Sequence, residues 1–166
     1  MPAHGKQGIN MSRTARTLTA TALITGAMLT AAAMPASAHQ DDRRHRGLEI
    51  GQVQYDAPGP DRRNDRSLNS EFFTVVNNGW HAVQLRNYTV SDRDGHTYTF
   101  DRLRLRRGQE VTVHTGHGRD HRWHRYQDSN RHLYDNNRGS LTLRTDGGNR
   151  VDQCRWGRGD GGHTDC

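Results

Sequence analysis

The chain has 166 residues and a formal net charge of +6, and 25% of its residues are charged against 31% that are hydrophobic. Its mean hydropathy of −1.06 is low enough to raise the question of disorder. The placement of the apolar residues argues against a disordered chain. From Leu48 onward they fall in short bursts between Gly, Asn and Asp, which is the pattern of strands joined by turns.

The first informative segment is residues 11–38, which have the features of a secretory signal peptide. Arg13 and Arg16 give a charged start, an apolar stretch follows, and Ala36-Ser37-Ala38 places small residues before a cleavage point at His39. We predict that the residues before His39 are removed and that the product is secreted to the extracellular space.

A membrane anchor is the alternative for the apolar stretch, Leu18–Ala33. Its 16 residues fall short of the roughly 20 that a membrane-spanning helix needs. We therefore expect residues 1–38 to be a signal peptide, with Met11 as an alternative start, and no transmembrane segment in the mature chain. Cleavage removes three basic and no acidic residues, so the net charge falls from +6 to +3. A flexible arm at residues 39–47 then precedes one domain at residues 48–156.

The apolar bursts predict about seven strands and no convincing amphipathic helix. Gly51 predicts a bulge or a change of face in the first strand, and Asn77-Asn78-Gly79 predicts a hairpin between the next two. Asp92-Arg93-Asp94-Gly95 predicts a tight turn rather than a calcium loop, because it lacks the later bidentate acid. Residues 56–67 and 115–131 are expected to be loops. The bursts are Leu48–Tyr55, Phe72–Val76, Val83–Val90, Tyr98–Phe100, Leu103–Leu105, Val111–Val113, Leu141–Leu143 and a closing strand around Val151.

Two antiparallel sheets packed face to face fit this strand count, so the predicted fold class is an all-β sandwich. Successive residues of a strand point to opposite faces of the sheet. Phe73 and Val75 are therefore expected on one face of the second strand, and Phe72, Thr74 and Val76 on the other. One of these two sets must build the core.

The order and spacing of these signatures resemble the lamin-tail domain family, which includes many secreted bacterial proteins. The resemblance covers about Leu48 to Trp156 and implies an immunoglobulin-like β-sandwich. It also implies an accessory extracellular role, with no general catalytic residues to carry over. The matching residues are Glu71-Phe72-Phe73-x-Val75-x-Asn77, Val83-x-Leu85-x-Asn87-Tyr88-x-Val90-x-Asp92, Gly95 with Tyr98 and Phe100, Arg107-Gly108 before Val111-x-Val113, His114-Thr115-Gly116-x-Gly118, and Leu141-x-Leu143 with Gly148 and Val151-Asp152.

Cys154 and Cys166 are an even pair in a chain that we predict to be exported, which favours a disulfide. The bridge would close a loop of 13 residues and tether the glycine-rich tail, residues 157–166, to the domain. A reactive thiol and a metal pair with His163 are the alternatives.

A histidine-rich segment offers the candidate metal ligands. His114, His117, His121 and His124 are spaced by three, four and three residues, and imidazole suits zinc, copper and nickel. Arginines in the same stretch would repel a dication, and the four rings need not converge. We therefore predict a solvated loop with no metal and no cofactor, and keep an extracellular metal-binding protein as the second alternative function.

The first alternative function is weak binding of a polyanion, either nucleic acid or a component of the cell envelope. Arg119, Arg122 and Arg125 lie among aromatic residues in the segment 114–132, a mixture suited to phosphate and to stacking. Acidic residues are interleaved with basic ones along the chain, so we expect a solvated face here rather than a nucleic-acid partner.

No motif for catalysis is found in the sequence, so we do not expect an enzyme. It has no G-x-S-x-G, no glycine-rich phosphate loop and no metalloprotease motif, and nothing marks a pair among its 18 acidic residues. The predicted function is a secreted module that binds an extracellular or cell-envelope partner or has a structural role. The sequence names neither the ligand nor the oligomeric state.

Overall fold

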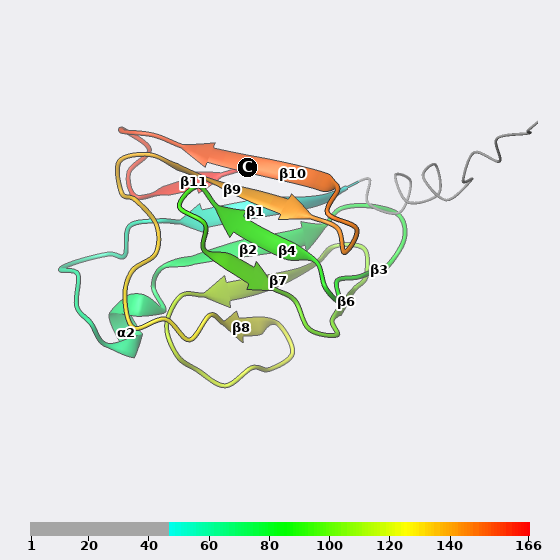
Figure 1. The fold of residues 1–166 in the computed structure, drawn as a ribbon, viewed down its shortest axis with the longest axis horizontal. Helices are drawn as coiled ribbons and strands as arrows, with labels where there is room; N and C mark the ends of the chain where they lie inside the picture. The colour runs from blue at the N-terminus through cyan, green and yellow to red at the C-terminus, as the bar shows by residue number, and fades with distance from the viewer. Residues whose placement is uncertain (1–46) are drawn as a thin grey trace, which may run out of the picture. The chain divides into compact units, whose positions relative to one another are not determined.

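The structure is a computed structural model that describes residues 47–166 (Figure 1). The predicted signal peptide and most of the predicted arm lie outside the described residues. Within residues 47–166, no helix has the length and apolar character that crossing a membrane requires. The elements are β1 (Leu48–Gln54), α2 (Asp65–Leu68), β2 (Phe72–Asn77), β3 (Val83–Gln84), β4 (Thr89–Asp92), β5 (Thr97–Thr99), β6 (Arg104–Leu105), β7 (Gln109–His114), β8 (His124–Tyr126), β9 (Gly139–Arg144), β10 (Arg150–Trp156) and β11 (His163–Asp165).

The strands of residues 47–166 form two main sheets and one small one (Figure 1). The larger sheet has the order β11-β1-β2-β7-β8, the second has the order β10-β9-β4-β5, and β3 pairs with β6. This arrangement is an immunoglobulin-like β-sandwich, which confirms the predicted fold class. The pairing is antiparallel throughout these sheets except between β7 and β8, which run parallel.

The core lies between the inner faces of the two main sheets. Phe73 and Val75 of β2 are fully buried, and they belong to the same apolar cluster as Leu141 and Leu143 of β9. The predicted division of β2 into two faces is therefore confirmed, and Phe73 and Val75 form the core face. Thr74 is also buried, although it lies on the opposite face of the strand.

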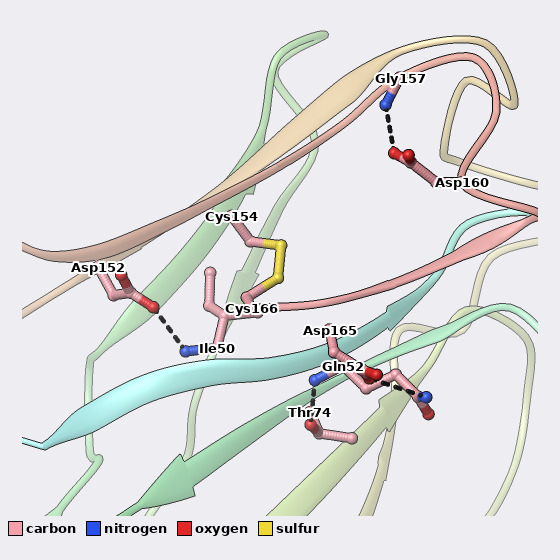
Figure 2. The surroundings of a disulfide bond; sticks show 9 residues. All are labelled: Ile50, Gln52, Thr74, Asp152, Cys154, Gly157, Asp160, Asp165 and Cys166. Atoms are coloured by element: carbon pink, nitrogen blue, oxygen red, sulfur yellow. Dashed lines mark hydrogen bonds between the residues drawn. A yellow bond between two sulfur atoms is a disulfide. The ribbon is translucent and has the colours of Figure 1, made fainter.

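The predicted bulge in β1 is present. The register of β1 on β2 shifts between Ile50 and Val53, and two backbone N–H groups of the bulge are satisfied by side chains (Figure 2). The N–H of Ile50 donates to Asp152 Oδ2 at 2.9 Å, and the N–H of Gln52 donates to Thr74 Oγ1 at 2.9 Å. The latter bond explains why Thr74 can be buried, because its hydroxyl oxygen has a partner.

The predicted hairpin after β2 is wrong. Strand β2 pairs with β1 and β7, while β3 pairs with β6 in the small sheet. The reason is Asn77, whose side chain organises the loop that follows. Its amide donates to the carbonyls of His81 at 2.8 Å and Leu105 at 3.0 Å, and its Oδ1 accepts from the N–H of Gly79 at 3.0 Å. These bonds direct the chain into a wider loop instead of a two-residue turn.

The loop predicted at residues 56–67 ends in a single helical turn, α2, which the sequence analysis missed. Asn64 caps this turn, since its Oδ1 accepts from the N–H of Ser67 at 3.0 Å. Leu68 at the end of the turn is buried. One buried leucine and one capping residue stabilise a single turn, but they do not produce the repeating apolar pattern by which a helix is predicted from sequence.

The loop predicted at residues 115–131 contains an unexpected strand, β8. The N–H of Thr112 donates to the carbonyl of Trp123 at 2.9 Å, and the N–H of Gln127 donates to the carbonyl of His114 at 2.9 Å. Strand β8 is the edge of the larger sheet, and its three residues are only partly buried. An edge strand of this kind needs no apolar residues, so alternation cannot reveal it.

The C-terminal tail is fixed to the other edge of the same sheet. A disulfide joins Cys154 of β10 to Cys166, and β11 pairs with β1 just before it (Figure 2). The carbonyl of Gly162 also accepts from the N–H groups of Tyr55 and Asp56, each at 3.0 Å. The tail thus covers the edge of β1 that would otherwise be exposed.

Reduction of the disulfide is expected to lower the free energy of unfolding by about 3 kcal/mol, because it releases a loop of 13 residues in the unfolded chain. Urea unfolding of the oxidised and the reduced chain measures the difference. Cys166→Ser is the control, since its stability should match that of the reduced chain and should not respond to reductant. Equal stability of the oxidised and reduced chains would contradict the prediction.

Candidate functional site

Four aromatic rings form a row along the edge of the larger sheet, where β7 ends beside β8. They follow one another in the order Tyr126, His114, His124 and His121, with ring centroids 5.1, 5.2 and 4.9 Å apart. A Cβ at Gly118 would overlap the Tyr126 ring, so this glycine lets the loop close over the row. We call these four residues the ring row.

His114 and His124 are joined directly within the ring row. His114 Nε2 lies 2.8 Å from His124 Nδ1, and His114 Nδ1 lies 2.8 Å from the carbonyl oxygen of Asn69. Because a carbonyl can only accept, His114 Nδ1 carries the proton and donates it to Asn69. His114 Nε2 then carries a lone pair, which accepts a hydrogen bond from the Nδ1–H of His124.

The surroundings of His114 favour its neutral form. Burial lowers its pKa from the ordinary histidine value, and the neighbouring His124 and His121 lower it further. The hydrogen bond to Asn69 acts in the opposite direction but does not outweigh burial. A neutral imidazole with a fixed tautomer is therefore available on this sheet edge.

The backbone of the 121–124 turn brings the third histidine to the row. The N–H of His121 donates to the carbonyl of His124 at 3.1 Å, and the N–H of His124 donates back to the carbonyl of His121 at 3.0 Å. Two residues paired in this way across an antiparallel bridge carry their side chains on the same side. The spacing of three residues between them is thus explained by a tight turn.

His117, the fourth candidate of the sequence analysis, lies apart from the ring row. Its Nε2 is 3.0 Å from Asn130 Oδ1, and its Nδ1 is 3.3 Å from Asp128 Oδ1. The hydrogen bond with Asn130 raises its pKa, and Asp128 adds to this effect. The structure therefore brings together three of the four predicted histidines and gives His117 acidic and amide partners instead.

Arg125 is held by the chain itself. Its Nη1 donates to the carbonyls of His124, at 2.9 Å, and His121, and its Nε lies 3.5 Å from Asp120 Oδ2. The guanidinium group thus braces the backbone of the 121–124 turn instead of facing the histidine rings as a free charge.

Other arginines of this segment also have partners in the chain. The guanidinium of Arg122 lies 5.1 Å from the ring centroid of Trp123, and Arg131 Nη2 lies 3.4 Å from His96 Nε2. Polyanion binding through residues 114–132 stays an untested alternative function. A polyanion would have to compete with these internal contacts.

A hollow of about 360 Å³ opens beside the ring row, between β7 and the residues leading into β8. His124 is one of its lining residues. The lining residues are Gly108, Gln109, Glu110, Thr112, Trp123 and His124.

A second cluster, around Glu71, was missed by the sequence analysis. Glu71 is fully buried, and its Oε1 accepts from the hydroxyl of Thr115 at 2.7 Å and from the N–H of Leu133 at 2.8 Å. His132 Nδ1 lies 3.3 Å from Glu71 Oε2. Burial raises the pKa of Glu71, although its hydrogen bonds and the charge of His132 act against that rise.

A series of three polar groups runs from the carboxyl group of Glu71 through the imidazole of His132 to the hydroxyl of Ser67. His132 Nε2 lies 3.4 Å from Ser67 Oγ, which also accepts from the N–H of Arg62 at 3.1 Å. Both contacts of the imidazole are longer than good hydrogen bonds to a carboxylate or a hydroxyl. The cluster fastens the loop before β9 to β7 and α2, since it links residues more than 40 positions apart.

Trp80 is the only large hydrophobic side chain of residues 47–166 that is strongly exposed, with 79% of its surface accessible. The guanidinium of Arg107 lies 3.9 Å from its ring centroid, which is a cation–π contact. Trp80 follows β2 and Arg107 precedes β7, so the two loops meet at the same end of neighbouring strands. The sequence analysis did not identify Trp80; a tryptophan directly after Asn77-Asn78-Gly79 is the signal that could have pointed to it.

A model of the Lamin Tail Domain family matches residues 42–158, a range that includes all the clusters described above. The chain belongs to the lamin tail domain family. The family resemblance drawn from the strand signatures is thereby confirmed. No curated protein matches the sequence.

Members of the lamin tail domain family are immunoglobulin-like modules, and membership alone specifies no reaction. Any specific function of this lamin tail domain must therefore be argued from its own residues. The ring row and the Trp80–Arg107 pair are surface features of this chain, whereas the Glu71 cluster is buried.

The variant Glu71→Gln is expected to change how stability depends on pH. Burial raises the pKa of Glu71 above 4.5, so the folded chain keeps a proton that the unfolded chain has already lost. The stability contributed by Glu71 is present below its unfolded pKa and is lost as the pH rises through the raised folded pKa. Gln does not titrate, so the variant should gain stability relative to the wild type on going from about pH 4 to about pH 7.5.

Urea unfolding of both chains at the two pH values measures this difference. Thr74→Val is the control, because it removes a buried hydroxyl that does not titrate. The difference between its free energy of unfolding and that of the wild type should not depend on pH. If Glu71→Gln loses stability relative to the wild type as the pH rises, the direction assigned to the Glu71 pKa is wrong.

Proposed function

We propose that this lamin tail domain is an exported, disulfide-stabilised module that acts by binding a partner outside the cell through its loops, without catalysis. The observation that carries the proposal is the pairing of exposed Trp80 with Arg107 on a sandwich whose other large apolar side chains in residues 47–166 are buried or partly buried.

Export is supported by the chemistry of the cysteines. Disulfides persist in oxidising compartments and are rare in the cytosol. The bond between Cys154 and Cys166 fixes the tail over the edge of β1, and the predicted cleavage point at His39 precedes the domain. Both features suit a chain that folds after export.

Binding through the Trp80 loop is supported by its exposure. A tryptophan left in water gains free energy when a partner covers it, and Trp and Arg are the residues most enriched at the energetic centres of interfaces. Arg107 holds one face of the ring and adds a donor and a positive charge beside it. An extracellular or cell-envelope partner with an acidic or polar rim would fit this surface.

Export is tested by producing the full chain in the cells that encode it. We expect the protein in the medium or at the cell surface, with an amino terminus at His39 and with both cysteines resistant to alkylation until reductant is added. A chain that stays in the cytosol with an intact leader and two reactive thiols would contradict the proposal.

The variants Trp80→Ala and Arg107→Ala test the binding surface. Labelled protein is added to washed envelopes of the producing cells, and the retained fraction is measured against concentration. We expect Trp80→Ala to weaken retention by about tenfold or more, as for a central interface residue, and Arg107→Ala to weaken it less. Arg93→Ala, in the exposed β4–β5 turn, is the matched arginine control. Equal retention of all three variants and the wild type would exclude this surface.

A further inference from the structure

The ring row has the organisation of a metal-binding histidine site. Histidines that bind metals usually donate their second ring N–H to a carbonyl or a carboxylate, which fixes the tautomer and aims the other nitrogen at the ion. His114 has this arrangement, because its Nδ1–H is held by the carbonyl of Asn69 and its Nε2 lone pair faces His124.

A second imidazole nitrogen lies directly beside His114 Nε2. His114 Nε2 and His124 Nδ1 are 2.8 Å apart. The 2.8 Å spacing is that of a hydrogen bond, so the choice of metal rests on the ligands: nitrogen ligands bind copper(II) more tightly than nickel(II) or zinc(II).

His121 is the candidate for a third ligand. In the structure of residues 47–166, no three side chains of His, Cys, Asp or Glu lie together so that they could hold a metal ion. His121 is exposed, however, and its ring centroid lies 4.9 Å from that of His124 on the same side of the turn. A rotation of its exposed side chain would bring it to an ion held by the other two rings.

Repulsion by the neighbouring arginines, which argued against a metal at the level of the sequence, is reduced in the structure. Arg125 donates to the carbonyls of the 121–124 turn and lies near Asp120, and Arg122 lies over Trp123.

We propose that His114 and His124 bind a copper(II) ion at the β7–β8 edge of this lamin tail domain, with His121 as the third ligand. On binding, the hydrogen bond between His114 and His124 breaks, and the lone pairs of His114 Nε2 and His124 Nδ1 each form a bond to the ion. The proton of His124 moves from Nδ1 to Nε2, so the ring stays neutral and no group is oxidised or reduced. This site is distinct from the Trp80–Arg107 surface and does not depend on it.

The test is a copper(II) titration of the full chain made without an affinity tag, followed by calorimetry and by electron paramagnetic resonance. We expect each chain to bind one copper(II) ion tightly and to bind zinc(II) more weakly. The paramagnetic resonance spectrum of the bound copper(II) should show couplings to nitrogen. His124→Ala and His114→Gln should each weaken binding by at least about tenfold. His117→Ala is the matched control, because it removes a histidine of the same segment that lies outside the ring row, and its affinity should equal that of the wild type.

A measurement on the wild-type chain keeps the test valid if a variant fails to fold. Substoichiometric copper(II) should broaden the imidazole NMR signals of His114 and His124 before those of His117 and His163. Copper(II) affinity that is the same in His124→Ala and in the wild type, broadening that begins at other histidines, or no heat above buffer would each overturn the site.

Discussion

Burial of the inner face of β2 is the interaction on which the rest of the structure depends. Phe73 and Val75 are fully buried in a strand that has β1 on one side and β7 on the other. Each such side chain contributes on the order of 1.5 to 3 kcal/mol when it leaves water. In a chain with few apolar residues, this contribution is available only if nearly all of them are inside. The core therefore uses up the apolar residues and leaves a polar surface on which single features such as Trp80 stand out.

The polar groups that this packing buries are met by specific partners, and those partners shape the surface. Glu71 lies at the start of β2 and accepts from Thr115 after β7 and from Leu133 before β9. Losing one of these donors would leave a buried carboxyl group with an unmet acceptor, which costs about 1 to 3 kcal/mol. The loops on either side of the ring row are thus held by one buried acid, so the row has a rigid base.

Local patterns in the sequence were enough to predict which residues of a strand share a face, but not which strands pair with each other. Alternation separated Phe73 and Val75 from the residues of the opposite face, although only the structure shows that they form the core face, and Gly51 marked the bulge. Both effects depend on neighbouring residues. The hairpin after β2 was wrong because Asn77 forms side-chain bonds with Leu105, 28 positions away. Such a contact has no signature at the turn itself.

The candidate site was likewise only partly predictable. The spacing of His121 and His124 reflects a tight turn, and His114 was in the same segment, so the sequence analysis already included the three histidines of the ring row. It could not separate them from His117, because only the fold shows that His117 turns toward Asp128 and Asn130. The Glu71–His132 contact spans 61 positions and was beyond any local reading.

The two edges of the larger sheet explain why its polar segments carry the features of interest. An open edge strand invites pairing with other chains, so proteins cover it with short, charged or irregular segments. Here β11 covers β1, and β8 covers the end of β7. Because the exposed side of β8 has to be polar, histidines and arginines can occupy it without replacing any apolar residue of the core. Parallel pairing with β7 places His124 beside His114. Protection of the sheet edge and assembly of the ring row are therefore consequences of the same pairing.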